Sequence, residues 1–118
     1  MYRMELSTKT EDPILIVSVN DDRIDAAVAI EFKDAMRTET LDGPKIMVLD
    51  LSAVNFIGSS GLGAIVASMK HMGQDRTLAL AGLTPTVDKV FRLTRMDTVF
   101  SLFATLGGAL DELCNRPT

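Results

Sequence analysis

The sequence predicts an α/β fold, with a four- to five-stranded mixed sheet and about four helices. Short apolar runs rich in β-branched residues alternate with segments whose apolar residues recur at helical spacing. Several glycines and prolines, among them Pro13, Gly43, Pro44, Gly73 and Gly82, fall between these segments and separate elements of one compact domain. The chain has 118 residues, of which 47% are hydrophobic, and we expect one domain over residues 1–118.

The strands follow from the apolar runs. Tyr2–Lys9 alternates loosely between apolar and polar residues and predicts an edge strand, which Glu11–Pro13 ends with a turn signal. The other expected strands are Ile14–Val19, Lys45–Leu51, Thr77–Ala81 and Val99–Phe103. Helical segments separate all but the first two, so the order is β-β-α-β-α-β-α-β-α. This order favours parallel crossovers, with the leading pair adding an antiparallel edge.

The helices follow from caps and helical spacing. Four are expected, at Ala26–Thr38, Ser60–Met72, Pro85 to about Leu93, and Thr105–Asn115. Asp25 is a suitable cap for the first, and Leu41–Pro44 stops it. Thr84 is expected to cap the third, with proline at its first position.

The second helix has two distinct faces. An apolar stripe comprises Leu62, Ile65, Val66, Met69 and Met72. The neighbouring face is small and smooth and comprises Ser60, Gly63, Ala64, Ala67 and His71. Such a face suits close packing, either on the sheet or against another protein.

Charge and cysteine content exclude several classes of function. The formal net charge is −4, and the basic residues form no run, which argues against binding to nucleic acid or to an anionic membrane. The single cysteine, Cys114, allows no intrachain disulfide and fits a reducing compartment. The first residues contain no apolar signal core, and no apolar run approaches the roughly 20 residues of a membrane span. We therefore expect a cytoplasmic protein without membrane insertion.

The segment Gly58–Gly63 does not match known catalytic motifs. A phosphate-binding loop needs a lysine where Ala64 stands, and the Gly-x-Ser-x-Gly elbow of serine hydrolases is absent. The only histidine, His71, lies about three helical turns from Ser60, too far to act as its base. One cysteine and one histidine cannot build a zinc site. We therefore expect no catalytic residue, no cofactor, no metal and no enzymatic activity.

Ser59 and Ser60 lie where a loop becomes a helix, and two interpretations remain. One serine can cap the helix, with Gly58 and Gly61 serving the tight turn. Alternatively, a hydroxyl at the positive end of a helix is a favourable place for a phosphate, or a contact that a phosphate would disrupt. The turn is richer in glycine and serine than a cap requires, which favours an interaction surface.

The segment Val48–Gly63 resembles the STAS-domain anti-sigma factor antagonists of the SpoIIAA and RsbV type. The family pattern is an apolar strand, Asp-Leu-Ser, a short spacer, an aromatic residue, and then Asp-Ser-Ser-Gly-Leu or a close variant. The element order and length also match over a core from about Glu5 to Leu113, and Thr84-Pro85 resembles the start of the family's third helix. The resemblance implies a single STAS domain.

The resemblance also implies a partner switch. The unphosphorylated protein would bind an anti-sigma factor that is also a serine kinase, and phosphorylation of the first serine, Ser59, would release it. A metal-dependent serine phosphatase would reset the protein. Asp25 matches a functional acidic residue of the family. The expected partner-binding residues are therefore Asp25, Gly58, Ser59, Ser60, Gly61, Gly63, Ala64 and Ala67.

This sequence departs from the family pattern at Gly58, where an acidic residue is frequent. The glycine removes one possible contact for a kinase. Other STAS proteins regulate different outputs, and some serve lipid transporters as accessory subunits without phosphorylation. A constitutive binding module is therefore the second hypothesis, and a small serine-dependent enzyme is the third.

Overall fold

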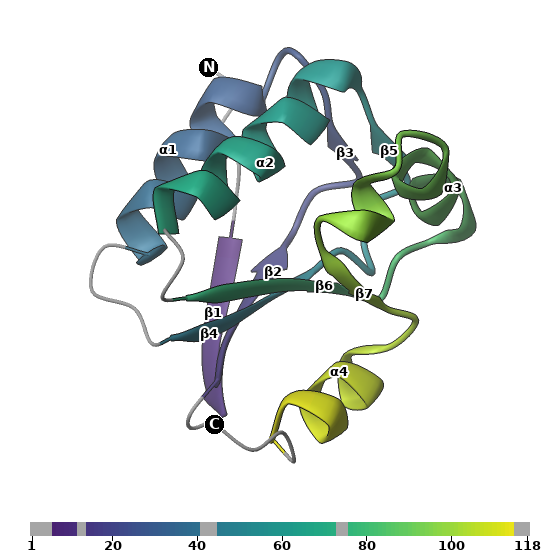
Figure 1. The fold of residues 1–118 in the computed structure, drawn as a ribbon. Coiled ribbons are helices and arrows are strands. Elements are labelled where there is room, and N and C mark those ends of the chain that lie inside the picture. Colours follow the sequence, from purple (N-terminus) through teal and green to yellow (C-terminus); the bar gives the residue numbers. More distant parts are fainter. Residues whose placement is uncertain (1–5, 12–13, 41–44, 73–75, 115–118) are drawn as a thin grey trace.

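The computed structural model describes residues 6–11, 14–40, 45–72 and 76–114, and these form a five-stranded mixed sheet and four α-helices (Figure 1). The sheet has the order β1-β2-β4-β6-β7, in which β1 is antiparallel to β2 and all other neighbours are parallel. Its strands are β1 (Leu6–Glu11), β2 (Ile14–Val19), β4 (Ile46–Asp50), β6 (Thr77–Ala81) and β7 (Ser101–Phe103). The predicted fold class is confirmed.

The helices cover the two faces of the sheet unequally. They are α1 (Ala29–Thr40), α2 (Ser59–Met72), α3 (Pro85–Leu93) and α4 (Leu106–Cys114), with a short 3₁₀ helix, η1, at Met96–Thr98. Figure 1 shows α1 and α2 side by side over one face and α4 on the opposite face. Side chains of α3 join the core under α1 and α2.

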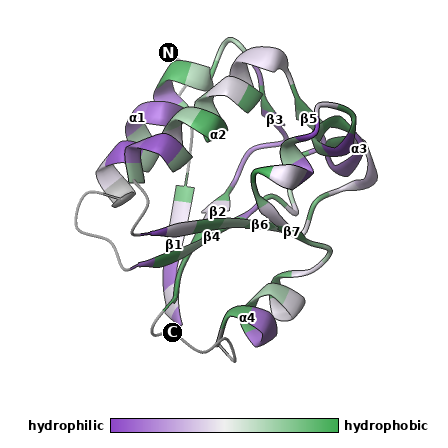
Figure 2. Cartoon of the chain, in the orientation of Figure 1, coloured by the Kyte–Doolittle hydropathy of each residue, from purple (hydrophilic) through white to green (hydrophobic). Residues whose placement is uncertain are grey.

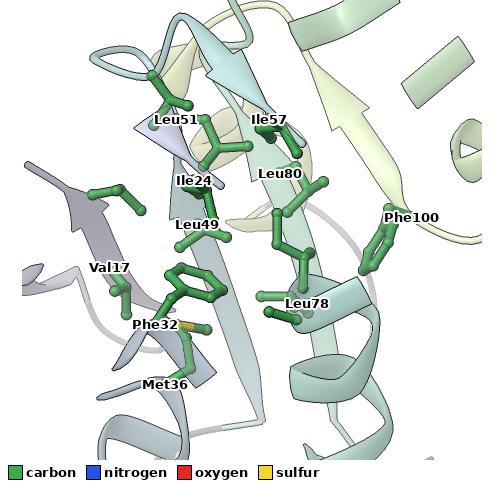
Figure 3. Close-up of a cluster of buried hydrophobic side chains, with 14 of the residues drawn as sticks. Val17, Ile24, Phe32, Met36, Leu49, Leu51, Ile57, Leu78, Leu80 and Phe100 are labelled. Carbon is green, nitrogen blue, oxygen red and sulfur yellow. The ribbon is translucent and has the colours of Figure 1, made fainter. Parts of the chain in front are cut away.

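The hydrophobic core lies on both sides of the central strands, which are coloured mostly hydrophobic in Figure 2. Met47 and Leu49 of β4 face the larger cluster under α1, α2 and α3, whereas Val48 between them faces the smaller cluster under α4. In Figure 3, Phe32 of α1 lies close to Leu49. All three β4 residues are fully buried, which confirms that this strand is covered on both faces.

The first helix begins later than predicted, at Ala29 and not at Ala26. The cause is Asp25, whose Oδ1 accepts the N–H of Ala27 at 3.1 Å and whose carbonyl accepts the N–H of Val28 at 3.1 Å. These bonds close a separate turn before α1, so the predicted cap acts on that turn and not on the helix. In the predicted turn Glu11–Pro13, Glu11 is the last residue of β1, and Asp12 and Pro13 lie outside the described residues. The stop at Leu41–Pro44 and the predicted start of the first strand also lie outside them.

A second, smaller sheet pairs two strands of two residues each, β3 (Arg23–Ile24) and β5 (Phe56–Ile57), in parallel. No pattern in the sequence indicates this pair of strands. The backbone continues the pairing, because the N–H of Gly58 donates to the carbonyl of Ile24 at 3.0 Å. The segment that follows β3 is therefore held beside the start of α2.

Candidate functional site

The candidate site is the N-terminus of α2, where Gly58 occupies the cap position. Its carbonyl accepts the first helical hydrogen bond, from the N–H of Leu62 at 2.9 Å. Ser59 is the first residue of the helix, one residue earlier than predicted, and Ser60 is the second. Both serines are exposed, and within the described part of the chain neither hydroxyl makes a hydrogen bond. Neither serine therefore serves as the cap.

Position 58 has room for a side chain. A Cβ built on Gly58 would lie 3.5 Å from the ring of Phe56 and 3.7 Å from the Cα of Asp25, both ordinary contacts. The φ angle of Gly58 is not in the left-handed region. Sterics therefore do not require glycine here. An acidic side chain would fit at this position, so its absence changes the charge of the site and not the backbone. The same contacts place Asp25 beside the residue that precedes Ser59.

Asp25 belongs to a small charged cluster at this edge. Its side chain is 23% exposed, and its Oδ2 lies 3.5 Å from Nη1 of Arg23. The guanidinium of Arg23 also lies over the ring of Phe56, 5.8 Å from the centroid, in a cation–π arrangement. The parallel pairing of β3 with β5 places Arg23 opposite Phe56. Arg23 and Phe56, which is 46% exposed, are site residues that the sequence analysis missed.

Gly61 lies beneath this surface and allows the start of α2 to approach β3. A Cβ at Gly61 would lie 2.0 Å from the carbonyl oxygen of Ile24, so no other residue fits without a shift of the backbone. Gly61 is buried. The structure gives this residue a packing role, and its contact with a partner stays a prediction.

The small-residue face of α2 is turned toward α1, where a hollow of about 180 Å³ opens between the helices. Within this face Ala64 is buried and Ala67 is half-buried, whereas Gly63 is exposed with nothing within 4 Å of its Cβ position. The hollow is lined by Ala29, Ile30, Lys33, Ser60, Gly63, Ala64 and Ala67. The structure thus brings four of the predicted residues, Ser60, Gly63, Ala64 and Ala67, around this hollow and places a fifth, Asp25, beside Gly58.

The three lining residues on α1 were not predicted to belong to the site. Lys33 is on the polar side of the helix in the sequence pattern, and nothing in the pattern indicates that it reaches α2.

Among the described residues, no group of three or more His, Cys, Asp and Glu is placed to hold a metal ion. No helix in the same part of the chain is long and apolar enough to cross a membrane.

Comparisons with known proteins identify the family of this chain. The STAS domain model matches residues 5–109. The anti-sigma-F factor antagonist RsfB of Mycobacterium tuberculosis is 31% identical over 97 residues, which cover 82% of this chain and 79% of the relative. The anti-sigma-B factor antagonist of Staphylococcus aureus is 25% identical over 92 residues, covering 77% and 84%. A crystal structure of an anti-sigma factor antagonist from Mycobacterium paratuberculosis superposes with a TM-score of 0.85, at 29% identity and 95% coverage of both chains. This chain therefore belongs to the STAS domain family.

Proposed function

We propose that this chain is an anti-sigma factor antagonist that works by partner switching in the cytoplasm. The unphosphorylated protein binds an anti-sigma factor that is also a serine kinase, and phosphorylation at Ser59 ends the complex. A metal-dependent serine phosphatase restores the binding form. The chain is a binder and a kinase substrate, not an enzyme. Its relatives support this proposal, because both curated proteins are named as antagonists of anti-sigma factors.

The observation that carries the proposal is the exposed Ser59 hydroxyl in the first turn of α2. The hydroxyl has no hydrogen-bond partner among the described residues, so its modification breaks no bond of the described fold. Phosphorylation adds a charge of about −1.5 to −2 at neutral pH, and the positive end of a helix tolerates that charge. The modification can therefore change the surface while the fold stays the same.

The surroundings of Ser59 make the surface sensitive to that charge. Asp25 already supplies a carboxylate at this edge, balanced by Arg23 at 3.5 Å. A phosphate on the neighbouring helix turn makes the edge strongly negative. A partner docked there would lose contacts through steric bulk, desolvation and charge repulsion. A loss of a few kcal/mol corresponds to more than about a hundredfold in affinity.

Phosphate transfer tests the proposal directly. Each kinase-type anti-sigma factor of the organism is purified and incubated with this protein and ATP, and the intact mass is measured. We expect one added phosphate on the wild type and on the matched control Ser60→Ala, but none on Ser59→Ala. A phosphate on Ser60 or elsewhere, with Ser59 unmodified, would contradict the assignment.

Binding provides a second test. We expect Ser59→Asp to weaken binding to the same anti-sigma factor by more than about a hundredfold, since the carboxylate partly reproduces the phosphate charge. Ser59→Ala should bind as the wild type does. Isothermal titration calorimetry measures both.

Gly58 favours a second candidate function. The position has room for a side chain, yet it carries no acidic group. A kinase that reads an acidic residue before the serine would not recognise this chain, and the protein would then be a constitutive binding module, such as an accessory subunit of a lipid transporter. Partner binding that Ser59→Asp leaves unchanged, together with no phosphate transfer, would decide for this function.

A further inference from the structure

The boundary between α1 and α2 carries two adjoining hollows that form one groove. The first, of about 180 Å³, begins at Ser60, and the second, of about 210 Å³, lies further along the helices. They share Lys33 and Ala67 in their walls, so one continues into the other. We call this feature, lined by residues of α1 and α2, the α1–α2 groove.

The two ends of the groove differ in chemistry. The end at Ser60 is small and apolar, with Ala29, Gly63 and Ala64 in its wall and with Ile30, which is 71% exposed, also lining it. The far end is lined by Lys33, Arg37, Ala67, Ser68 and His71. The hydroxyl of Ser68 donates to the carbonyl of Ala64 at 2.9 Å, so the basic side chains dominate this end.

The charge of the groove is opposite to the charge of the chain. The chain has 16 acidic and 12 basic residues, with a net charge of −4. Among the described residues, none of the acidic ones lines either hollow, whereas Lys33 lines both. A groove with an apolar pocket at one end and basic side chains at the other complements a segment that carries an apolar residue followed by carboxylates.

We propose that the α1–α2 groove receives an acidic segment of the anti-sigma factor, an inference that rests on the proposed function above. An apolar side chain of that segment occupies the end beside Ser60, and its carboxylates lie at the end formed by Lys33 and His71. The position of Ser60 in the wall makes the groove continuous with the candidate phosphorylation site.

The groove also gives a physical reason why phosphorylation would release the partner. A phosphate on Ser59 is attached one residue from the wall of the groove and carries a charge of about −1.5 to −2. An acidic segment is repelled by that charge, whereas a neutral or basic segment is not. The same electrostatics predict that binding of the unmodified protein weakens as salt is added, since salt screens exposed charges.

Two exposed glycines offer a matched test of the groove. Gly63 lines the groove on α2, and Gly107 lies on α4 on the opposite face of the sheet. Both are helical, and a Cβ at either would meet nothing within 4 Å. Gly63→Glu should therefore fold normally and yet weaken binding to the anti-sigma factor by about tenfold or more, because it adds bulk and a like charge. Gly107→Glu should bind within about twofold of the wild type.

The basic end is tested with Lys33. We expect Lys33→Glu to weaken binding and Lys33→Gln to reduce the dependence of the dissociation constant on salt. Lys89→Glu is the matched control, because Lys89 is an exposed lysine on α3 away from the groove. Calorimetric titrations at two salt concentrations measure these effects, and circular dichroism confirms that each variant is folded.

The possible results separate the two proposals. If no anti-sigma factor of the organism binds the wild type, the proposed function fails and the groove inference fails with it. If a factor binds and Ser59→Asp weakens it, but Gly63→Glu and Lys33→Glu act no more strongly than their controls, only the groove inference is overturned. If the wild type alone sediments as a dimer that Gly63→Glu dissociates, the groove binds a second copy of this chain, which also overturns the inference.

Discussion

Two helices of this protein begin with hydroxyl residues that have different tasks. At the start of α4, Oγ1 of Thr105 accepts the N–H of Gly108 at 3.0 Å, so this hydroxyl caps the helix. At the start of α2, glycine takes the cap position, and the hydroxyls of Ser59 and Ser60 make no hydrogen bond within the described residues. A shift of one position along the chain therefore separates a hydroxyl that stabilises a helix from one that is available for modification.

The start of α3 shows a third arrangement. Thr84 holds the cap position before Pro85, as predicted, but its hydroxyl makes no capping bond. It donates instead to the carbonyl of Val54 at 2.8 Å and so ties α3 to the loop between β4 and β5. The residue type at a helix start thus indicates where the helix begins. Which group its hydroxyl bonds to depends on the backbone that packs beside it.

The largest expected effect concerns the glycine beneath the serines. Gly61→Ala should lower the free energy of unfolding by about 3 kcal/mol or more, because its Cβ would lie 2.0 Å from a backbone oxygen of Ile24. The matched variant Gly63→Ala should raise the free energy of unfolding by about 0.5–1 kcal/mol, since it replaces glycine in an exposed helical position. Urea denaturation measures both, and equal effects at the two glycines would refute the packing role of Gly61.

An intermediate effect is expected at the two helix starts. Thr105→Ala should cost about 1 kcal/mol of stability, because the variant loses the capping bond to Gly108. Ser59→Ala should change stability by no more than about 0.5 kcal/mol, since no bond is lost. Chemical denaturation of both variants under one set of conditions gives the comparison. A cost at Ser59 as large as that at Thr105 would show that Ser59 has a structural task.

The smallest expected effect on stability is that of Ser59→Asp. A carboxylate in the first turn of a helix interacts favourably with the helix dipole, by about 0.3–1 kcal/mol at low salt, and the nearby Asp25 opposes this gain. The thermal unfolding midpoint should therefore stay close to that of the wild type. Differential scanning calorimetry measures it. A large drop would support the capping interpretation and would also weaken any conclusion from the binding assay.

Much of the fold could be predicted because its elements carry strong local signals. Ile14–Val19 and Thr77–Ala81 were predicted with the bounds that the structure shows, and Thr84-Pro85 marked the start of α3. The pair β3 and β5 was missed because two residues cannot show a period, and their pairing depends on contacts that are distant in the sequence. The extra turn after Asp25 was missed because a cap residue has the same sequence signature in a turn as in a helix.

The candidate site was predictable only in part for the same reason. The serines and glycines of Gly58–Gly63 stand out in the sequence as one short segment. Arg23 and Phe56 do not stand out, because they are far apart in the sequence. They come together only through the pairing of β3 with β5. The groove depends on how α1 and α2 pack, which no local pattern of Lys33 could indicate.

The pairing of β3 with β5 has a consequence for how the site can be recognised. It joins Asp25 and Ser59, which come from separate parts of the chain, into one conformational epitope. A synthetic peptide that copies residues 55–64 contains both serines but lacks the aspartate, the arginine and the α1 wall of the groove. A kinase that reads the joined surface therefore distinguishes the folded protein from its unfolded chain, and from fragments of it, before any phosphate is transferred.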